Sequence, residues 1–183
     1  MASERPVVIL VTGLQGSGKS TVAGWAGGHL DAVVFGWDWA MAGLARCPDL
    51  QTVLEDMDRL AYRRVGWTLL WQLSTAELRR GRSVVLDGMA RAEEVARTRQ
   101  LARSHDAISM IVVARCDDLP AQRARIEGRR RDIPGWYELD WEHVSQARQH
   151  WEQPGDVDIE LDTTDAIEET RSRLLVAIAR QCR

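Results

Sequence analysis

The chain has 183 residues, which suffices for one α/β domain with a substantial core and is too short for two full domains. Its formal net charge of −3 at pH 7 argues against a surface that coats nucleic acid, although a local basic cluster could still contact a polynucleotide. Residues 1–6 lack a signal-peptide pattern and no apolar stretch reaches membrane-spanning length, so we expect a cytoplasmic protein without membrane contacts. A single domain over residues 1–183 is therefore expected, and nothing in the composition indicates an oligomeric state.

A phosphate-binding loop follows the first predicted strand. Residues 6–12 form an uninterrupted apolar run rich in β-branched residues, as a buried parallel strand requires. Residues 13–20, Gly-Leu-Gln-Gly-Ser-Gly-Lys-Ser, match the complete pattern G-x-x-x-x-G-K-[ST], and the residues after Lys19 can continue as a helix. Glycines allow backbone N–H groups to point inward, and the helix N-terminus adds partial positive charge. The pattern predicts a nucleotide-binding site, with a glycine-rich structural turn as the alternative.

Lys19 is the only lysine in the chain, although 24 residues are lysine or arginine. A compact ammonium fits between the β- and γ-phosphates in the narrow loop, whereas a guanidinium is too broad. We therefore expect Lys19 to be catalytic and the hydroxyl of Ser20 to bind Mg²⁺. The residues expected to bind ATP are Gly13, Gln15, Gly16, Ser17, Gly18, Lys19, Ser20 and Thr21, together with Arg123 from later in the chain.

Four further strands are predicted at residues 32–36, 83–87, 108–114 and 157–161. The first three are apolar runs and the last alternates, so the last is the expected edge strand. Apolar residues at helical spacing predict a helical region from residue 50, after a Pro48-Asp49 cap, to about residue 80. A capping box at residues 165–168 is expected to begin the C-terminal helix. This alternation predicts a parallel sheet covered on both faces, with ligands beyond the carboxyl ends of its strands.

Two aspartates at strand ends could carry the chemistry. Asp38 follows the second strand, between Trp37 and Trp39, and Asp87 ends the third strand. Phosphoryl transfer to a hydroxyl needs a group that orients the nucleophile and accepts its proton, and a second carboxylate can hold the water shell of Mg²⁺. We assign the first role to Asp38 and the second, with a contribution to acceptor binding, to Asp87. The alternatives are a cap or turn aspartate at Asp38 and an Asp-Gly turn at Asp87.

Aromatic residues near Asp38 are the candidates for acceptor binding. Trp37 and Trp39 could belong to the core, or they could stack on a planar substrate beside the base. Trp136 lies in a helix-breaking segment, residues 134–137, and Arg91 follows the third strand. The predicted acceptor site comprises Trp37, Asp38, Trp39, Asp87, Arg91 and Trp136.

Five arginines fall within residues 123–131, after the fourth strand. Guanidinium groups on a mobile segment can close over ATP and neutralise charge on the transferring phosphoryl group. We therefore predict a lid at approximately residues 120–150 and assign catalytic roles to Arg125, Arg129 and Arg130. A solvated or salt-bridged helix face is the alternative.

Together, these segments resemble the small P-loop kinases of the group that contains chloramphenicol phosphotransferases, gluconate kinases, zeta toxins and the kinase domain of phage polynucleotide kinase. The likeness is closest to the chloramphenicol phosphotransferases and extends over nearly the full length. It rests on the opening strand and loop to Ser20 and on residues 35–38, 114–117 and 158–164. The resemblance implies a three-layer α/β sandwich with a five-stranded parallel sheet and the phosphate-binding strand at its centre. It also implies ATP and Mg²⁺ as cosubstrates and an aspartate base at Asp38.

The departures from this resemblance lie in segments expected to determine which acceptor is bound. Trp37 stands where the antibiotic kinase has a smaller residue, and residues 134–137 have no match in it. Fold and reaction class therefore transfer more safely than substrate. We expect an ATP-dependent kinase that phosphorylates a hydroxyl of a small molecule, first a natural product or antibiotic and then a nucleoside or sugar. A polynucleotide 5′-hydroxyl kinase is the first alternative, and a nucleotide-dependent switch or binding module without an acceptor is the second.

Overall fold

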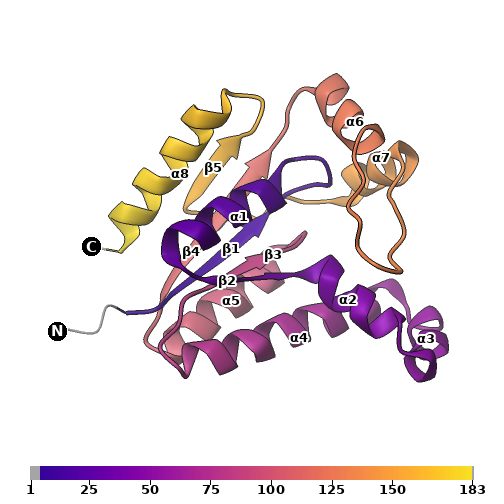
Figure 1. Cartoon of the computed structure of the whole chain (residues 1–183), viewed down its shortest axis with the longest axis horizontal. Helices are drawn as coiled ribbons and strands as arrows, with labels where there is room; N and C mark the ends of the chain where they lie inside the picture. Colours follow the sequence, from indigo (N-terminus) through magenta and orange to yellow (C-terminus); the bar gives the residue numbers. More distant parts are fainter. Residues whose placement is uncertain (1–4, 183) are drawn as a thin grey trace.

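The computed structural model describes residues 5–182, which form a three-layer α/β sandwich around one parallel sheet (Figure 1). Within that range the five strands are β1 (Val7–Thr12), β2 (Val33–Gly36), β3 (Val84–Asp87), β4 (Ile108–Arg115) and β5 (Ile159–Asp162), in the order β2-β3-β1-β4-β5. The helices are α1 (Lys19–Leu30), α2 (Trp37–Ala45), α3 (Pro48–Glu55), α4 (Arg59–Leu78), α5 (Ala92–Ser104), α6 (Leu119–Glu127), α7 (Trp141–His150) and α8 (Ile167–Gln181). Residues 1–4, part of the segment considered for a signal peptide, lie outside the described residues.

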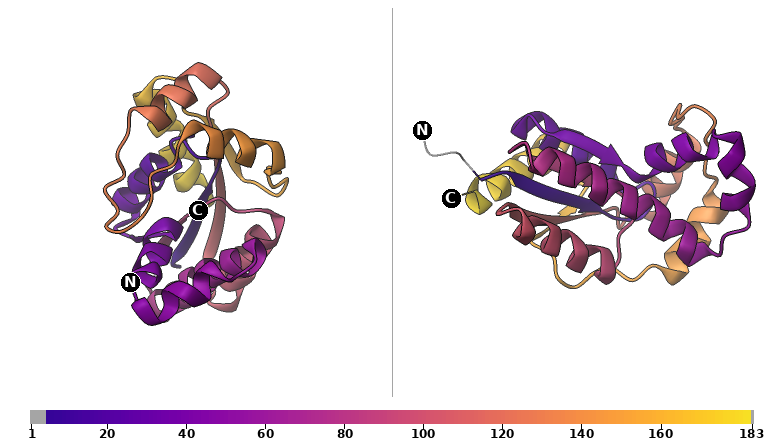
Figure 2. Two further views of the ribbon diagram at one scale, coloured as in Figure 1. Left: turned by 90° about the vertical axis from the view of Figure 1, so that its right-hand side faces the viewer. Right: turned by 90° about the horizontal axis from the view of Figure 1, so that it is seen from below.

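β1 is the central strand of the sheet, and helices cover it on both faces. All of its residues are buried, and it pairs in parallel with β3 on one side and β4 on the other. Ile9 and Val11 pack with residues of α1 and α8, whereas Leu10 packs with residues of α4 and α5. Figure 2 shows helices on both faces of the sheet. An uninterrupted apolar strand is what a sheet with two covered faces requires.

The predicted five-stranded parallel sheet is confirmed within residues 5–182, with the loop-bearing strand at its centre. The predicted strand bounds agree with the observed ones to about two residues at each end, the usual uncertainty of such limits. β5 lies at an edge as predicted, and β2 forms the other edge. Val33 and Val34 of β2 are exposed although they belong to an apolar run, because an edge strand has no neighbour to cover its outer side.

The helical region predicted for residues 50–80 consists of two helices rather than one. α3 ends at Glu55, and α4 begins at Arg59. The carboxylate of Asp58 caps α4, because it accepts hydrogen bonds from the backbone N–H groups of Leu60 and Ala61. α3 begins with Pro48 at its first position, without a side-chain cap from Asp49. The apolar spacing continues across this break, so periodicity alone did not detect it.

The capping box predicted at residues 165–168 is wrong. The N-cap residue of α8 is Ala166, whose side chain cannot accept a hydrogen bond. Asp165 instead forms an ion pair with Arg173, with 3.3 Å between the guanidinium Nη1 and the carboxylate. The carboxylate of Asp165 therefore binds a side chain of α8 and does not cap the N–H groups of its first turn.

The loops at the carboxyl ends of the strands carry α2, α3, α6 and α7, which lie together on one side of the molecule (Figure 1). α6 and α7 are joined by residues 128–140, which descend toward α2. This connection places the arginine-rich segment opposite the strand-end aspartates. Within residues 5–182, no helix is both long and apolar enough to span a membrane.

Candidate active site

The phosphate-binding loop joins β1 to α1, and its glycines adopt backbone angles that other residues rarely adopt. Gly16 and Gly18 have φ angles of 78° and 80°, and Gly13 has a φ angle of 151°. A Cβ atom on Gly13 would lie 2.2 Å from the carbonyl oxygen of Ala114 in β4. Gly18 is the N-cap residue of α1. The loop therefore ends at a helix N-terminus, which is a favourable position for a phosphate group.

Two side chains from distant parts of the chain hold the loop in place. The amide of Gln122 in α6 donates a hydrogen bond of 2.6 Å to the carbonyl oxygen of Gln15. The hydroxyl of Thr163, after β5, donates to the carbonyl oxygen of Ser17 at 2.9 Å. Arg125 in turn donates to the hydroxyl and carbonyl oxygens of Thr163, at 2.7 Å each. The conformation of the loop thus depends on contacts outside its own motif, and the sequence analysis missed both Gln122 and Thr163.

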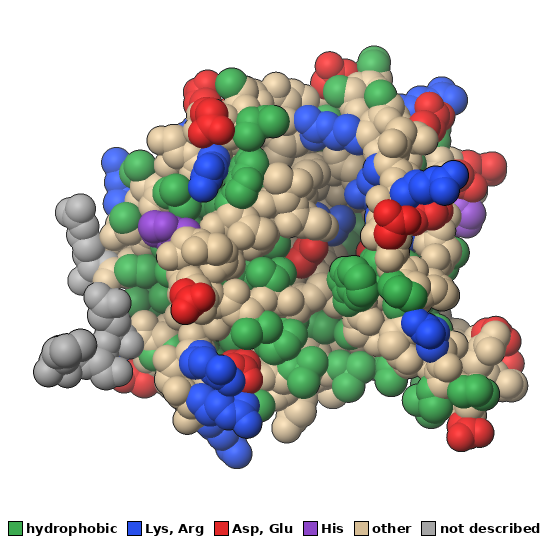
Figure 3. Space-filling model, in the orientation of Figure 1, with side chains coloured by type: hydrophobic (Ala, Val, Ile, Leu, Met, Phe, Trp, Pro, Cys, Tyr) green, Lys and Arg blue, Asp and Glu red, His purple; other side chains and the backbone are tan. Residues whose placement is uncertain are grey.

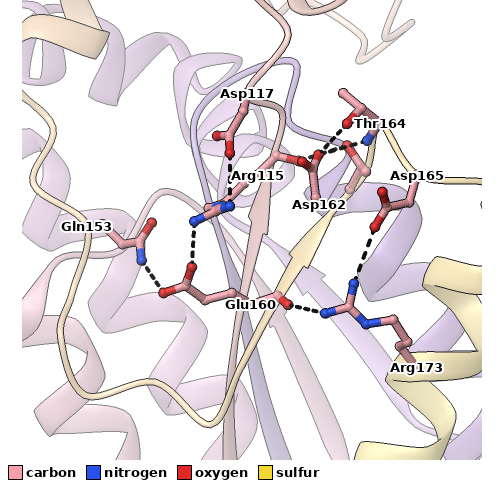
Figure 4. A network of polar contacts seen from close by, with 9 residues as sticks. Arg115, Asp117, Gln153, Glu160, Asp162, Thr164, Asp165 and Arg173 are labelled. Atoms are coloured by element: carbon pink, nitrogen blue, oxygen red, sulfur yellow. Dashed lines mark hydrogen bonds and ion pairs between the residues drawn. The ribbon is translucent and has the colours of Figure 1, made fainter.

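A polar network around the end of β5 positions Thr163 (Figure 4). Arg115 in β4 pairs with Glu160 in β5 at 2.9 Å. The carboxylate of Asp162 accepts hydrogen bonds from the N–H and the hydroxyl of Thr164, and these bonds lower the pKa of Asp162. Thr163 therefore lies in a turn that is tied to the sheet on one side and closed by its own side chains on the other.

A cavity of about 490 Å³ opens beside the loop, at the carboxyl ends of the strands. Figure 3 shows a hollow between the body of the molecule and the segment after α6, with basic and acidic side chains inside it. A cavity of this size suits a small-molecule ligand. It is lined by Gln15, Lys19, Ser20, Gly36, Trp37, Asp38, Trp39, Arg59, Tyr62, Arg63, Trp67, Asp87, Gly88, Met89, Arg91, Arg129, Arg131, Ile133, Tyr137 and Leu139.

Lys19, Ser20 and Asp87 form the end of the cavity next to the loop. Burial lowers the pKa of Lys19, and the carboxylates of Asp87 and Asp38 oppose that effect. Burial raises the pKa of Asp87, against the attraction of Lys19 and a hydrogen bond with Ser20. An anion placed beside Lys19 and a cation placed beside Asp87 would each stabilise the charged form of its neighbour.

The residues at this end fit a magnesium ion. The Oδ1 atom of Asp87 is buried and has no hydrogen-bond partner among the described residues, while Ser20 is hydrogen-bonded to the same carboxyl group. Mg²⁺ is usually held by one or two carboxylates together with substrate phosphates and water, so a larger acidic cluster is not needed. Residues 5–182 contain no group of three or more His, Cys, Asp or Glu placed to hold a metal ion. Ser20 and Asp87 are thus placed as a magnesium site would require.

Asp38 lies in the first turn of α2 and lines the same cavity. Its carboxylate forms an ion pair of 2.7 Å with Arg131. Arg131 is held there by Glu138, at 3.3 Å, and by the carbonyl oxygen of Tyr137. The N-cap residue of α2 is Gly36, so Asp38 is not the cap that was considered as an alternative. Its side chain is available to the cavity.

The five arginines of residues 123–131 have different environments. Arg129 and Arg131 line the cavity, whereas Arg130 is exposed and lies outside the cavity lining. The reason is that α6 ends at Glu127, so the side chains of residues 129–131 no longer follow helical spacing. The catalytic role predicted for Arg130 is therefore not supported, and Arg131 stands in the position expected of it.

Arg123 and Arg125 lie on α6, before residues 129–131. Arg123 is exposed and pairs with Glu127 at 2.7 Å, as the alternative of a salt-bridged helix face predicts, so nucleotide binding by Arg123 is not supported. Arg125 and Arg129 line a second hollow on the outer side of the loop, together with Gly16, Gly18 and Thr21. Arg125 is thus placed beside the nucleotide loop rather than beside Asp38.

Trp37 forms part of the cavity wall opposite the loop. It fits closely against α4 and the end of β3, since a Cβ atom on Gly66 would lie 2.2 Å from its Nε1 and one on Gly88 would lie 3.1 Å from its Cβ. Its Nε1 donates to the carbonyl oxygen of Arg63 at 3.3 Å. Trp37 therefore belongs to the packed interior and also lines the cavity, and its stacking on a planar substrate stays a prediction.

The remaining aromatic residues differ in their exposure. Trp39 lines the cavity and is 59% exposed, so it lies at the rim. Trp136 packs edge-on against Trp37 at 6.4 Å and lies outside the lining, so it supports the wall from behind. Tyr62 and Tyr137 also line the cavity; Tyr137 belongs to the helix-breaking segment 134–137, whereas Tyr62 was not predicted. Burial, Tyr137 and Asp38 raise the pKa of Tyr62 to about 12, so its hydroxyl stays protonated and can donate a hydrogen bond.

Comparison with protein families matches residues 8–154 to AAA_33, an AAA domain, and the chain belongs to this family. A search among curated proteins finds no match. Similar solved structures include a gluconokinase from Sinorhizobium meliloti 1021, 18% identical with a TM-score of 0.68 over 97% of this chain and 94% of that one. An APS kinase from Mycobacterium tuberculosis, in complex with AMPPNP and APS, is 20% identical with a TM-score of 0.64 over 96% and 98%. A sugar kinase from Janibacter sp. HTCC2649 is 16% identical with a TM-score of 0.66 over 96% and 95%.

These structures share the P-loop kinase fold with this chain. At such low identities the likeness concerns the fold, because one fold can carry different acceptors. The acceptor must therefore be inferred from the cavity of this chain.

Proposed function

We propose that the protein is an ATP-dependent kinase that transfers the γ-phosphoryl group to a hydroxyl of a small molecule. The observation that carries this proposal is the position of Asp38 in the same cavity as Lys19 and Asp87. A phosphate-binding loop would serve a nucleotide-dependent switch as well as a kinase. A carboxylate across the cavity provides a proton acceptor for which a switch has no use.

At the nucleotide end, Lys19 and the N–H groups of the loop would hold the phosphates of ATP. Ser20 and Asp87 would hold Mg²⁺, which when bound neutralises charge on the β- and γ-phosphates. Arg129 acts electrostatically on both Lys19 and Asp87, so it is placed to stabilise the charge on the transferring group.

At the acceptor end, the hydroxyl would bind between Asp38 and the γ-phosphate. Its oxygen forms a bond to the γ-phosphorus while the bond to the bridging oxygen of the leaving ADP breaks, and the hydroxyl proton passes to Asp38. Arg131 must give up its 2.7 Å contact with Asp38 before the carboxylate can accept this proton. A γ-phosphate offers Arg131 a second anion, so nucleotide binding and release of the base would be coupled.

A small acceptor is favoured by the size of the cavity, about 490 Å³, and by its cover of residues 129–139. The names of a gluconokinase and a sugar kinase among the similar structures agree with such an acceptor, and the AMPPNP complex of the APS kinase agrees with an adenine nucleotide. The narrower resemblance to chloramphenicol phosphotransferases supports the aspartate base at Asp38, although Trp37 favours a different acceptor. An ATP-dependent activity on small molecules also agrees with a cytoplasmic location.

The proposal can be tested with purified protein, Mg²⁺ and γ-labelled ATP. Hydroxylated small molecules, DNA and RNA with free 5′-hydroxyls, and a reaction without acceptor are compared. We expect labelled small products that disappear in the Asp38→Asn variant. Labelling of polynucleotide ends alone would identify a polynucleotide kinase. ATP binding or hydrolysis without any labelled product would identify a switch.

A further inference from the structure

Three arginines line the acceptor side of the cavity, and the mechanism above uses none of them. Arg59 and Arg63 lie one turn apart on α4, so their side chains project from the same face of the helix. Arg91 is the N-cap residue of α5, and it lines the same cavity. We call Arg59, Arg63 and Arg91 the arginine wall.

One buried carboxylate holds this wall together. Glu94 is 5% exposed, and its Oε1 lies 2.5 Å from the Nη2 atom of Arg63. Its Oε2 accepts a hydrogen bond of 2.8 Å from the backbone N–H of Arg91. Glu94 thus pairs with the guanidinium group of Arg63 and with the backbone of Arg91. It is the one carboxylate in an ion pair with the wall among the described residues, so the wall retains an excess of positive charge.

Part of the wall has unused hydrogen-bonding capacity. The Nε atoms of Arg63 and Arg91 are buried and lack hydrogen-bond partners within residues 5–182. A buried donor without an acceptor destabilises the fold, so both guanidinium groups would gain from a rearrangement that brings an acceptor to them, and both residues line the cavity. Guanidinium groups bind carboxylates and phosphates through paired hydrogen bonds, which suits such an anion.

At the other end of the cavity each carboxylate already has a basic partner, and Arg129 is the one further basic side chain of residues 5–182 that lines it. Lys19 faces Asp87, and Arg131 pairs with Asp38. Among the described residues, six basic side chains and two carboxylates line the cavity, so the excess cannot be assigned to the nucleotide end alone. The α5 N-terminus lies at Arg91 and adds partial positive charge on the same side.

We propose that the acceptor carries an anionic group, a carboxylate or a phosphate, which binds to the arginine wall while its hydroxyl faces Asp38. This inference rests on the proposed kinase function, and it narrows the acceptor class from small hydroxyl compounds in general to acidic ones. Trp37 and Tyr62 border the wall, so a flat ring between the anion and the hydroxyl fits the same space.

The test compares pairs of related probes of which one carries an anionic group and the other does not. Binding of 4-(hydroxymethyl)benzoate and its methyl ester, and of uridine 5′-monophosphate and uridine, is measured by calorimetry in the presence of Mg²⁺ and excess AMPPNP. The anionic member of at least one pair should bind at least about tenfold more tightly than its neutral partner. A preference within the benzoate pair indicates a carboxylate site, and a preference within the uridine pair indicates a phosphate site.

Variants locate the effect on the wall. Arg59→Gln and Arg91→Gln should each reduce the preference for the anion several-fold, whereas Arg91→Lys should retain part of it. Arg64→Gln is the matched control, because Arg64 neighbours Arg63 on α4 but lines the outer groove between α4 and α5.

The outcomes separate this inference from the kinase proposal. Equal affinity within both pairs, no binding of either anion at millimolar concentration, or a preference that survives both glutamine variants would overturn the inference. Phosphorylation of neutral acceptors without any charge preference would leave the kinase and remove the acidic acceptor. A charge preference at the wall without phosphoryl transfer to any probe or screened compound would keep the anion site and count against the kinase.

Discussion

The two ends of the cavity are built in different ways. The nucleotide end is formed largely by one short segment, residues 13–20, in which backbone N–H groups and one lysine would contact the ligand. The acceptor end is assembled from α2, α4, the start of α5 and residues 129–139. Recognition by backbone groups depends on local conformation, whereas recognition by side chains depends on how distant elements meet. The shared chemistry is thus encoded locally, and the choice of acceptor is distributed over the fold.

Asp38→Asn should reduce phosphoryl transfer more than the other variants, because Asp38 lies between the nucleotide end and the acceptor end of the cavity. The amide keeps the size of the side chain and loses the proton acceptor, so transfer should fall about 10²–10⁴-fold. ATP affinity, measured by calorimetry, should change little. Asp49→Asn, in the first turn of the neighbouring helix α3, is the control. An unfolded variant, or unchanged transfer per bound complex, would show that Asp38 is structural.

Lys19 tests the nucleotide end by itself. Lys19→Ala should reduce transfer by about 10²–10³-fold and weaken ATP binding, since it removes the charge between the phosphates. Lys19→Arg should do little better, because the planar guanidinium does not fit the loop. Turnover and ATP affinity are measured for both variants. Near-normal activity of the arginine variant would contradict the steric explanation for the single lysine.

Neighbouring arginines offer a matched comparison of lid and surface. Arg131→Gln and Arg129→Gln should lower kcat by about tenfold or more with little change in melting temperature, because they would act on the transferring charge. Arg130→Gln should change kcat by less than about threefold, as expected for an exposed residue. Arg125→Gln should weaken ATP binding more than it lowers kcat. Equal losses of kcat at Arg130 and Arg131 would show that a place in the cavity lining does not determine which arginine acts in catalysis.

The buried carboxylate of Asp87 predicts a dependence on pH. Burial raises its pKa, so protons compete with Mg²⁺ at a higher pH than at an exposed aspartate. Activity at limiting Mg²⁺ should fall as the solution is acidified, and added Mg²⁺ should move this fall to lower pH. The same raised pKa means that Asp87 favours folding below its unfolded pKa and loses that contribution as pH rises through its folded pKa. A decline that does not respond to Mg²⁺ would exclude Asp87 as the titrating group.

The smallest effect is expected at the support of the loop. Thr163→Val keeps the shape of the side chain and removes the hydroxyl that donates to Ser17, at a cost of about 1 kcal/mol in the free energy of unfolding. ATP affinity should fall a few-fold. Thr164→Val, whose hydroxyl binds Asp162 instead, is the comparison. Unchanged ATP affinity in both variants would show that the loop holds its conformation without this support.

Strand positions were predictable because a buried parallel strand needs a continuous apolar run, whereas the central place of β1 was expected from the resemblance to P-loop kinases. The break at residues 56–58 was missed because apolar spacing continues across it, although the side chain of Asp58 caps the start of the second helix. Arg130 was preferred to Arg131 because a helical interpretation of the cluster cannot show that α6 ends at Glu127.

The sequence by itself determined the fold class, the loop and the strand-end aspartates Asp38 and Asp87, because each depends on a local pattern of residue types. Only the tertiary structure decided which arginines enter the cavity, that Thr163 and Gln122 support the loop, and that Glu94 gathers Arg63 and Arg91. Those contacts join residues far apart in the chain, and they form only when the helices pack against the sheet. A local sequence pattern cannot predict such contacts, because it contains only one of the two residues that form each contact.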